Sequence, residues 1–149
     1  MKKIFILILL CTYGCGYQPV YLNKGLKNLE FNKINLEGNK QINRKIINSL
    51  PINQNKLNEG LHELFLKTNL ETTETSKDSK GKTLSYRTTI YVDFKIKKND
   101  KIIKNKEITK DISYSNKENK FELVEFQRQI TSSLVQTATE EIILFLNLE

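Results

Sequence analysis

Hydrophobic and polar residues alternate over one stretch of this chain more regularly than anywhere else. The seven even positions from 84 to 96 are mostly apolar: Leu84, Tyr86, Thr88, Ile90, Val92, Phe94 and Ile96. The odd positions are mostly polar and include Arg87, Tyr91, Lys95 and Lys97. Successive side chains of a β-strand point to opposite faces of its sheet. The pattern therefore predicts a long strand whose even side packs on a core and whose odd side faces water or a partner.

Two neighbouring strands are predicted to pair with this one. Residues 98–101, Lys-Asn-Asp-Lys, have the composition of a tight hairpin turn, and residues 102–114 return in phase after it. On the other side, leucines alternate with polar residues after Gly60, which favours a strand, and a run of threonines follows. Residues 52–60 are rich in Asn and Lys and are predicted as a loop, with a helix over 56–66 as the alternative. Three consecutive antiparallel strands are implied.

In the N-terminal part of the domain, the spacing of apolar residues changes from that of a strand to that of a helix. Residues 29–37 alternate with one slip around Asn32 and Lys33, which is typical of a bulged or edge strand. Residues 39–50 instead carry isoleucines and a leucine at helical spacing, with an asparagine as the first residue to cap the helix. Pro51 supplies the stop.

A long helix is predicted to close the chain. Ser115 and Glu118 have the spacing of a capping box. Apolar residues then step by three and four positions: Leu123, Phe126, Ile130, Leu134, Ala138, Ile142, Phe145 and Leu146. About 28 residues at 1.5 Å each make a helix about 40 Å long, enough to cover the apolar face of a whole sheet.

These elements predict an α+β fold in a single domain over residues 29–149. The order is β-α-β-β-β-α, and the expected architecture is a four-stranded, largely antiparallel sheet with two helices packed on one face.

The first residues have the layout of an export signal. Lys2 and Lys3 precede a short apolar run of about eight residues, whereas a membrane-spanning helix needs roughly twenty. The run ends at Gly14, Cys15 and Gly16, an arrangement that favours a bacterial lipoprotein signal over residues 1–14 with Cys15 as the lipidated residue. An ordinary secretory signal is the alternative. The aperiodic residues 15–28 would then be a lipidated tether, and the only attached groups expected are a diacylglycerol and an N-acyl chain on Cys15.

The chain offers little for catalysis. His62 is the only histidine, Glu140 and Glu141 are adjacent on a helix and are interpreted as solvated charges, and no Cys and His set with zinc spacing occurs. Glycines in the spacing of a phosphate-binding loop are also missing. We therefore expect a binding or assembly protein with no catalytic residues, no metal and no enzymatic activity.

The basic charge gathers on the predicted hairpin. The formal net charge is +7, and export argues against nucleic acid as the partner. Lys95, Lys97, Lys98 and Lys101 are the candidate contacts for anionic groups, such as the phosphates of a lipid, or for a partner protein. Lys104, Lys106 and Lys110 follow on the returning strand. The alternative is a lysine-rich solvated edge that prevents sheet-to-sheet aggregation.

The segment Cys15 to Tyr21, Cys-Gly-Tyr-Gln-Pro-Val-Tyr, resembles the start of mature lipopolysaccharide-assembly lipoproteins, the LptE family. The element order, the hairpin over 84–114 and the long closing helix are similar too. The resemblance implies a lipid-anchored protein of the outer membrane whose domain faces the periplasm or sits inside a barrel lumen. It also implies two partners: an LptD-type β-barrel, which the domain plugs and helps to assemble, and lipopolysaccharide, which it helps to deliver to the outer leaflet. Only Cys15 is transferred from the family as a site residue.

Another class of protein shares the signal and the size. A different periplasm-facing outer-membrane lipoprotein, such as an auxiliary component of a lipid transporter or a secretion pilot protein, is the alternative that these residues leave open.

Overall fold

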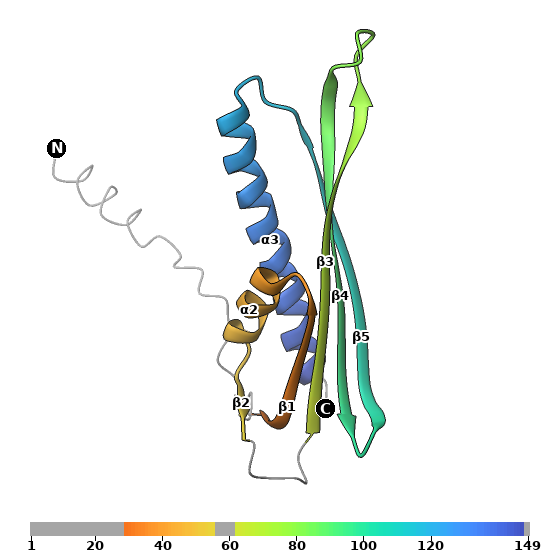
Figure 1. Cartoon of the computed structure of the whole chain (residues 1–149), viewed down its shortest axis with the longest axis vertical. Helices are drawn as coiled ribbons and strands as arrows, with labels where there is room; N and C mark the ends of the chain where they lie inside the picture. Colours follow the sequence, from red (N-terminus) through yellow and green to blue (C-terminus); the bar gives the residue numbers. More distant parts are fainter. Residues whose placement is uncertain (1–28, 56–61, 148–149) are drawn as a thin grey trace, which may run out of the picture.

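The computed structural model describes residues 29–55 and 62–147, which form one sheet and two helices (Figure 1). In chain order the elements are β1 (Leu29–Gly38), α2 (Lys40–Ser49), β2 (Ile52–Gln54), β3 (His62–Lys77), β4 (Thr83–Lys98), β5 (Lys101–Ser115) and α3 (Lys120–Asn147). The sheet has five strands in the order β2-β1-β3-β4-β5. The predicted signal, tether and Cys15 lie outside the described residues.

The sheet is mixed rather than four-stranded and largely antiparallel. β3, β4 and β5 form the predicted antiparallel series, but β1 pairs in parallel with both β3 and β2. The prediction missed β2, which lies in the segment expected to be a loop. Three residues are too few to show an alternating pattern, and β2 is defined by its pairing with Leu29, Glu30 and Phe31 of β1. Alternation can reveal a strand, but it carries no information on strand direction.

The predicted turn and bulge are both present. Asn99 and Asp100 have positive φ angles of 49° and 62°, the conformation that a two-residue hairpin turn requires at both central positions. In β1 the register with β3 shifts between Phe31 and Lys33, where the sequence predicted a slip. The bulge leaves Phe31 in the core, where it is 2% exposed.

A tight joint connects β1 to α2. Asn39 caps the helix as predicted, because its side chain accepts hydrogen bonds from the backbone N–H groups of Gln41 and Ile42, each at 3.1 Å. Just before it, Gly38 has φ +82°, and a Cβ there would lie 1.9 Å from the carbonyl oxygen of Thr68. The Asn39 N–H donates to that same carbonyl at 3.0 Å. The chain can therefore leave the sheet at this point only through a glycine.

The buried Asn43 fixes the position of α2 on the sheet. Its amide donates to the Glu37 carbonyl at 2.8 Å, and its oxygen accepts from the Thr68 hydroxyl at 2.7 Å. Both polar ends of this buried side chain are satisfied, so the contact defines one orientation of the helix.

The closing helix has its predicted length but a different cap. It spans 28 residues. Its N-cap is Asn119 rather than the predicted pair Ser115 and Glu118, because the Asn119 side chain accepts from the N–H of Phe121 at 2.8 Å. Ser115 is instead the last residue of β5, paired with Ser85 of β4. Ser115, which the local sequence pattern assigned to the helix cap, is therefore part of the sheet instead.

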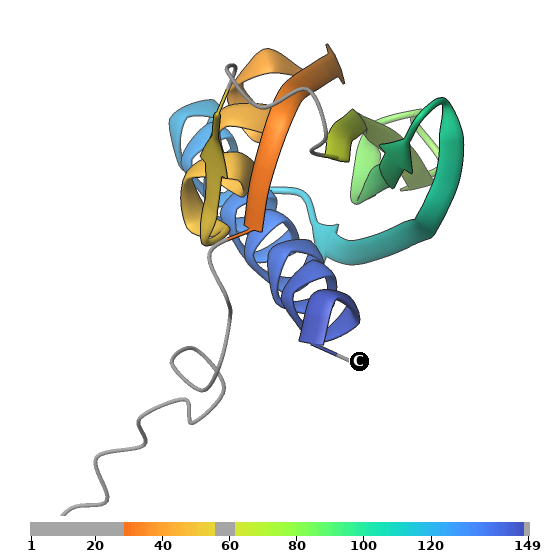
Figure 2. The ribbon, with the colours of Figure 1, turned by 90° about the horizontal axis from the view of Figure 1, so that it is seen from below.

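Both helices pack on the same face of the sheet, with α2 against β1 and β3 and α3 against β4 and β5 (Figure 2). The even side of β4 faces them as predicted. The core consists of Phe31, Ile42, Ile46, Leu50, Leu64, Leu66, Ile90, Val92, Phe94, Ile96, Ile108, Leu134, Val135, Ala138, Ile142 and Ile143.

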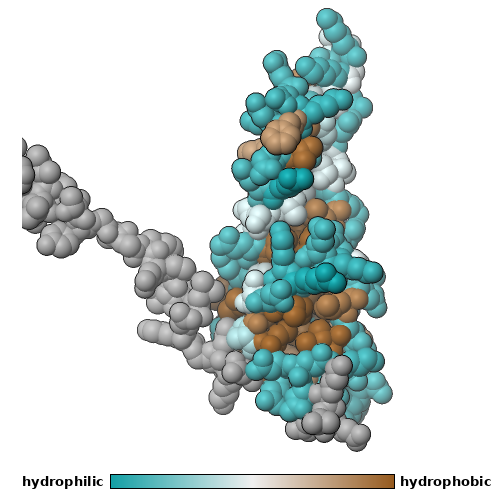
Figure 3. Space-filling view, turned by 60° about the vertical axis from the view of Figure 1, so that its left-hand side comes forward, coloured by the Kyte–Doolittle hydropathy of each residue, from teal (hydrophilic) through white to brown (hydrophobic). Residues whose placement is uncertain are grey.

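The molecule divides along its length where β1 ends. We call the part with β1 and β2 the lower half and the part beyond it the upper half, which begins at Asn69, Tyr91 and Thr109 on the three long strands. The β3–β4 hairpin projects at the top (Figure 1). On the face seen in Figure 3, most of the hydrophobic surface gathers in the lower half.

Candidate functional site

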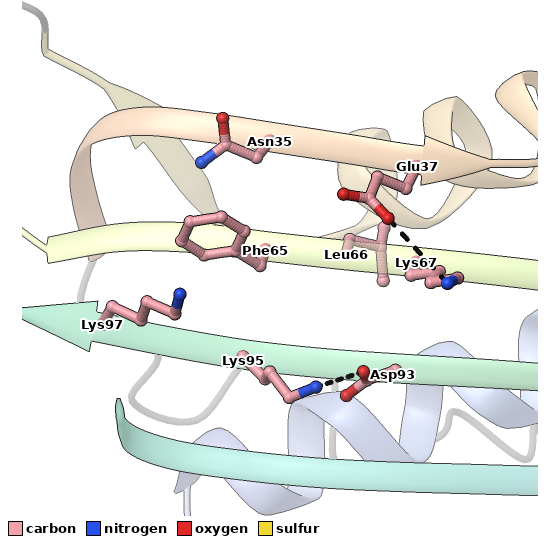
Figure 4. Close-up of a pocket in the computed structure, with 8 residues that line it drawn as sticks. All are labelled: Asn35, Glu37, Phe65, Leu66, Lys67, Asp93, Lys95 and Lys97. Atoms are coloured by element: carbon pink, nitrogen blue, oxygen red, sulfur yellow. Dashed lines mark hydrogen bonds and ion pairs between the residues drawn. The ribbon is translucent and has the colours of Figure 1, made fainter. Parts of the chain in front are cut away.

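A hollow of about 250 Å³ lies on the outer face of the sheet, opposite the helices (Figure 4). Strands β1, β3 and β4 contribute its walls. The lining residues are Asn35, Glu37, Phe65, Leu66, Lys67, Asp93, Lys95 and Lys97. Strand alternation explains all of the set except the core residue Leu66, since a strand that buries one side chain directs the next to this face. Asp93, Lys95 and Lys97 are among the odd positions of β4 that the sequence predicted to face water or a partner.

Phe65 lies between Asn35 and Lys97 in the hollow (Figure 4). The Lys97 ammonium is 4.2 Å from the centroid of the Phe65 ring, within the range of a cation–π contact. This contact places one cation over an aromatic face at the edge of the hollow.

A second cation, Lys95, is paired with Asp93 on the same strand. The hydrogen bond that Lys95 donates to the Asp93 carboxylate, together with the charge of that carboxylate, raises the pKa of Lys95 above its ordinary value. Lys95 therefore keeps its positive charge at neutral pH. Farther along the hollow, Lys67 lies 4.0 Å from Glu37, a longer and exposed ion pair.

Two polar atoms in the hollow have unused hydrogen-bonding capacity. Asp93 Oδ1 and Asn35 Nδ2 are buried, and neither has a hydrogen-bond partner among the described residues. One is an acceptor and the other a donor, and a buried polar group without a partner is costly. A ligand with anionic oxygens would contact the neighbouring lysines, whereas it would reach the two buried atoms only after their side chains moved.

The structure divides the four predicted lysines into two pairs. Lys95 and Lys97 line the hollow, whereas Lys98 and Lys101 are exposed and face each other across the β4–β5 turn. The sequence did not single out Asn35, Phe65 or Asp93. Each of these residues lies at a position of its strand that points to the outer face of the sheet. They can be recognised as neighbours only when the strand order β1-β3-β4 is known.

The remaining lysines of the predicted cluster point the other way. Lys106 and Lys110 lie on the helix side of β5 and bind Glu141 of α3 at 2.9 and 2.7 Å. Hydrogen bonds from Lys110 and Lys106 lower the pKa of Glu141. The interpretation of Glu141 as a solvated charge was wrong, because the register of β5 brings two ammonium groups to it. The lysines are thus not one basic tip.

Metal-ligand clusters and membrane-spanning helices are absent from residues 29–55 and 62–147. No group of three His, Cys, Asp or Glu side chains in these ranges could hold a metal ion. Neither α2 nor α3 combines the length and the apolar character of a membrane span. His62 lies half-buried at the start of β3 and is not among the residues that line the hollow.

Comparisons with known proteins give the fold but no sequence family. The chain matches no protein-family model, and no curated protein matches its sequence. Solved structures do match. Rare lipoprotein B from Shewanella oneidensis superposes with a TM-score of 0.61 at 15% identity, over 76% of this chain and 92% of its own.

Two further lipoprotein structures are similar to this chain. The minor lipoprotein from Acinetobacter baumannii has a TM-score of 0.56 at 13% identity, over 79% of this chain and 92% of its own. Lipoprotein B from Nitrosomonas europaea has a TM-score of 0.52 at 10% identity, over 82% of this chain and 86% of its own. The α+β fold described above is therefore shared with bacterial lipoproteins, while the sequences have diverged widely.

Proposed function

We propose that this chain is an outer-membrane lipoprotein that plugs an LptD-type β-barrel, assists the assembly of that barrel and helps to deliver lipopolysaccharide to the outer leaflet. The observation that carries the proposal is the fold, which covers 92% of rare lipoprotein B from Shewanella oneidensis. The segment from Cys15 to Tyr21 supports it independently, because it combines the lipidation pattern with the resemblance to the LptE family. The role needs no catalysis.

The physical properties of the domain suit a barrel lumen. The lumen of a large outer-membrane barrel is polar, and a plug must present a polar exterior to it. Here the helices cover only one face of the sheet, and the other face carries charged and amide side chains around the hollow. Acyl chains on Cys15 would anchor the protein, since each buried methylene contributes roughly 0.8 kcal/mol.

The hollow and the β4–β5 turn are the proposed contacts for lipopolysaccharide and the barrel. Lys95 and Lys97 would meet phosphates at the hollow. Lys98 and Lys101 would extend the basic surface beyond the hollow to the end of the molecule.

The first experiment is purification of the full, lipidated chain from its own membranes in mild detergent. We expect a large β-barrel to co-purify in a defined ratio. A preparation in which no barrel is retained would contradict the plug assignment and favour another periplasm-facing lipoprotein, such as a transporter auxiliary component or a secretion pilot protein.

Charge reversal tests the lysines separately from the fold. We expect Lys98→Glu with Lys101→Glu, and separately Lys97→Glu, to reduce barrel recovery and binding of purified lipopolysaccharide. The matched control is Lys80→Glu with Lys82→Glu, which makes the same charge change in the exposed β3–β4 turn at the other end of the sheet. Equal binding by all variants would remove these lysines from the site.

A further inference from the structure

The edge of β3 is open in the upper half. β1 accompanies β3 only as far as the pair Gly38 and Thr68, and then turns away into α2. β3 continues to Lys77 with β4 on one side, and no strand among the described residues pairs with its other side. The residues 69–77 therefore form a strand edge about nine residues long.

The backbone groups on this edge can be assigned from one hydrogen bond. The Asn39 N–H donates to the Thr68 carbonyl from the β1 side. Along a strand, the N–H and C=O of every second residue point to the same side. Leu70 and Thr72 therefore direct their backbone donors and acceptors to the open edge, before the irregularity near Glu74.

The two edges of the sheet differ in how they are protected. β5, at the far edge, carries Lys101, Lys104, Lys106 and Lys110, the kind of charge that discourages another strand from pairing. Residues 69–77 of β3 contain no proline and only one lysine, Lys77 at the end of the strand, which is paired with Glu74 at 2.8 Å. They include three threonines, which favour extended chain. The β5 edge of the sheet thus carries more lysines than the open edge of β3.

A groove of about 380 Å³ lies directly beside the open edge, on the helix side. Ile42, Leu70 and Val124 give it apolar walls, and Val124 is 46% exposed. Lys45 and Arg128 also line it, and Arg128 has an exposed 3.4 Å ion pair with Glu125, which is not part of the lining. The full lining is Asn39, Gln41, Ile42, Lys45, Leu70, Thr72, Val124, Gln127, Arg128 and Thr131. A strand added to β3 would place its inward side chains here.

We propose that the open edge of β3 accepts a β-strand from a partner protein, with the inward side chains of that strand in the groove. The partner segment is extended, alternates apolar residues on its inward side, and carries an acidic residue that meets Lys45 and Arg128. Main-chain hydrogen bonds to Leu70 and Thr72 supply affinity, and the groove supplies specificity. This interaction goes beyond the proposed function and does not depend on it.

A second copy of this chain is a poorer occupant. Antiparallel pairing of two β3 edges would bring Glu71 and Glu74 of one copy close to the same residues of the other, and like charges across strands are destabilising. It would also bring two basic grooves together on the helix side. A partner strand with an acidic inward residue avoids both repulsions.

The first test uses the full chain and a synthetic peptide that alternates valine and threonine and carries one inward aspartate. We expect binding to slow amide hydrogen exchange at Leu70 and Thr72, and Thr72→Pro to weaken it at least about tenfold. Proline removes the outward N–H but no bond of the β3–β4 ladder. Thr72→Val is the matched control, because both variants lose the 2.9 Å hydroxyl contact with Thr88 and only valine keeps the N–H.

Unchanged exchange at Leu70 and Thr72 on addition of the peptide would overturn the proposal, as would equal binding by Thr72→Pro and Thr72→Val. Exchange protection in β4 and β5 serves as the measure of folding in every variant.

The second test places a photo-cross-linking residue at Gln127 in the full chain in its own cells. The expected adduct maps to an extended segment of another protein. An adduct with a second copy, or with residues 15–28 of the same chain, would assign the edge to that occupant and refute this one.

Discussion

The lower and upper halves of the sheet are held by different kinds of contact. In the lower half, two helices cover the strands and the core is mainly aliphatic, with Ile46, Leu64 and Ile142 at 0% exposure, although Phe31 and Phe94 are buried there too. In the upper half, α3 covers most of the sheet, α2 reaches only the groove beside Leu70 and Thr72, and the packing layer around Tyr114 is aromatic. Tyr114 lies 5.8 Å from Tyr86 and 5.7 Å from Phe126, measured between ring centroids.

Hydroxyl groups connect the upper strands across the sheet. The side chain of Thr88 lies 2.9 Å from the Thr72 hydroxyl and 3.0 Å from the Tyr114 hydroxyl, so one chain of contacts joins β3, β4 and β5. Few large apolar side chains are buried there. The lower half therefore provides most of the stability, whereas the upper half offers exposed strand for binding.

The largest effect is expected at the joint of the lower half. Gly38→Ala should lower the free energy of unfolding by about 3 kcal/mol, because the new Cβ meets the Thr68 carbonyl oxygen in a backbone conformation that disfavours side chains. Gly81→Ala is the matched control, since Gly81 has the same positive φ but open space around it. It should cost only about 1 kcal/mol. Urea unfolding of both variants measures the difference, and equal losses would refute the close contact.

A smaller loss is expected from the aromatic layer of the upper half. Phe126→Ala removes a half-buried ring that contacts Tyr114 and should cost about 2 kcal/mol. Hydrogen exchange should accelerate in residues 83–91 more than in the lower half of β4. The control is Phe121→Ala, whose side chain is 78% exposed and should change stability little. Uniform acceleration along β4 would mean that the two halves unfold as one unit.

Removal of a single hydroxyl should have a still smaller effect. Tyr114→Phe keeps the ring contacts but breaks the hydrogen bond with the buried Thr88, at a cost of about 1 kcal/mol. Thermal unfolding measures it. Thr75→Val provides a comparison, because its hydroxyl contact with Ser85 is exposed and should contribute less. A larger loss for Thr75→Val would contradict the role of the hydroxyl chain.

The smallest effect is expected where Glu141 connects the two halves, since Lys106 belongs to the lower half and Lys110 to the upper. The ion pairs lower the pKa of Glu141, so they stabilise the fold above the ordinary value of 4.5 and are lost as pH falls below it. Glu141→Gln should therefore cost about 0.5–1 kcal/mol at pH 7 and less at pH 3. Glu140→Gln is the matched control for removing one carboxylate from the same turn of α3. A constant difference at both pH values would exclude the ionic cause.

Local patterns predicted most elements but not their arrangement. The alternation over 84–96 was sufficient for β4 because it reflects burial on one face, and Asn39 was sufficient for the start of α2. β2 was missed since three residues acquire strand structure only through β1. Asn119 replaced the expected cap because Ser115 is used by the sheet. These errors have one source, which is pairing between residues far apart in sequence.

The candidate site was predictable only in part for the same reason. Lys95 and Lys97 stood out by charge, but their neighbours Asn35 and Phe65 come from β1 and β3 and depend on strand order. The charge pattern also could not separate Lys97 on the outer face from Lys106 at Glu141, because the direction of each side chain follows from register. The prediction for Cys15 concerns chemistry outside the described residues and remains a prediction.

The parallel pairing of β1 and β3 also sets how the domain would stand on a bilayer. Leu29 begins β1 at the same end as the Lys98 and Lys101 turn, because His62 pairs with Phe31 and Glu63 pairs with Lys97. A lipid on Cys15, fourteen positions before Leu29, would hold that end within about 50 Å of the membrane surface. The open edge of β3 lies at the distal end. The lysine turn is therefore at the end of the domain where the chain from Cys15 enters, and the open edge of β3 is at the end farther from that entry.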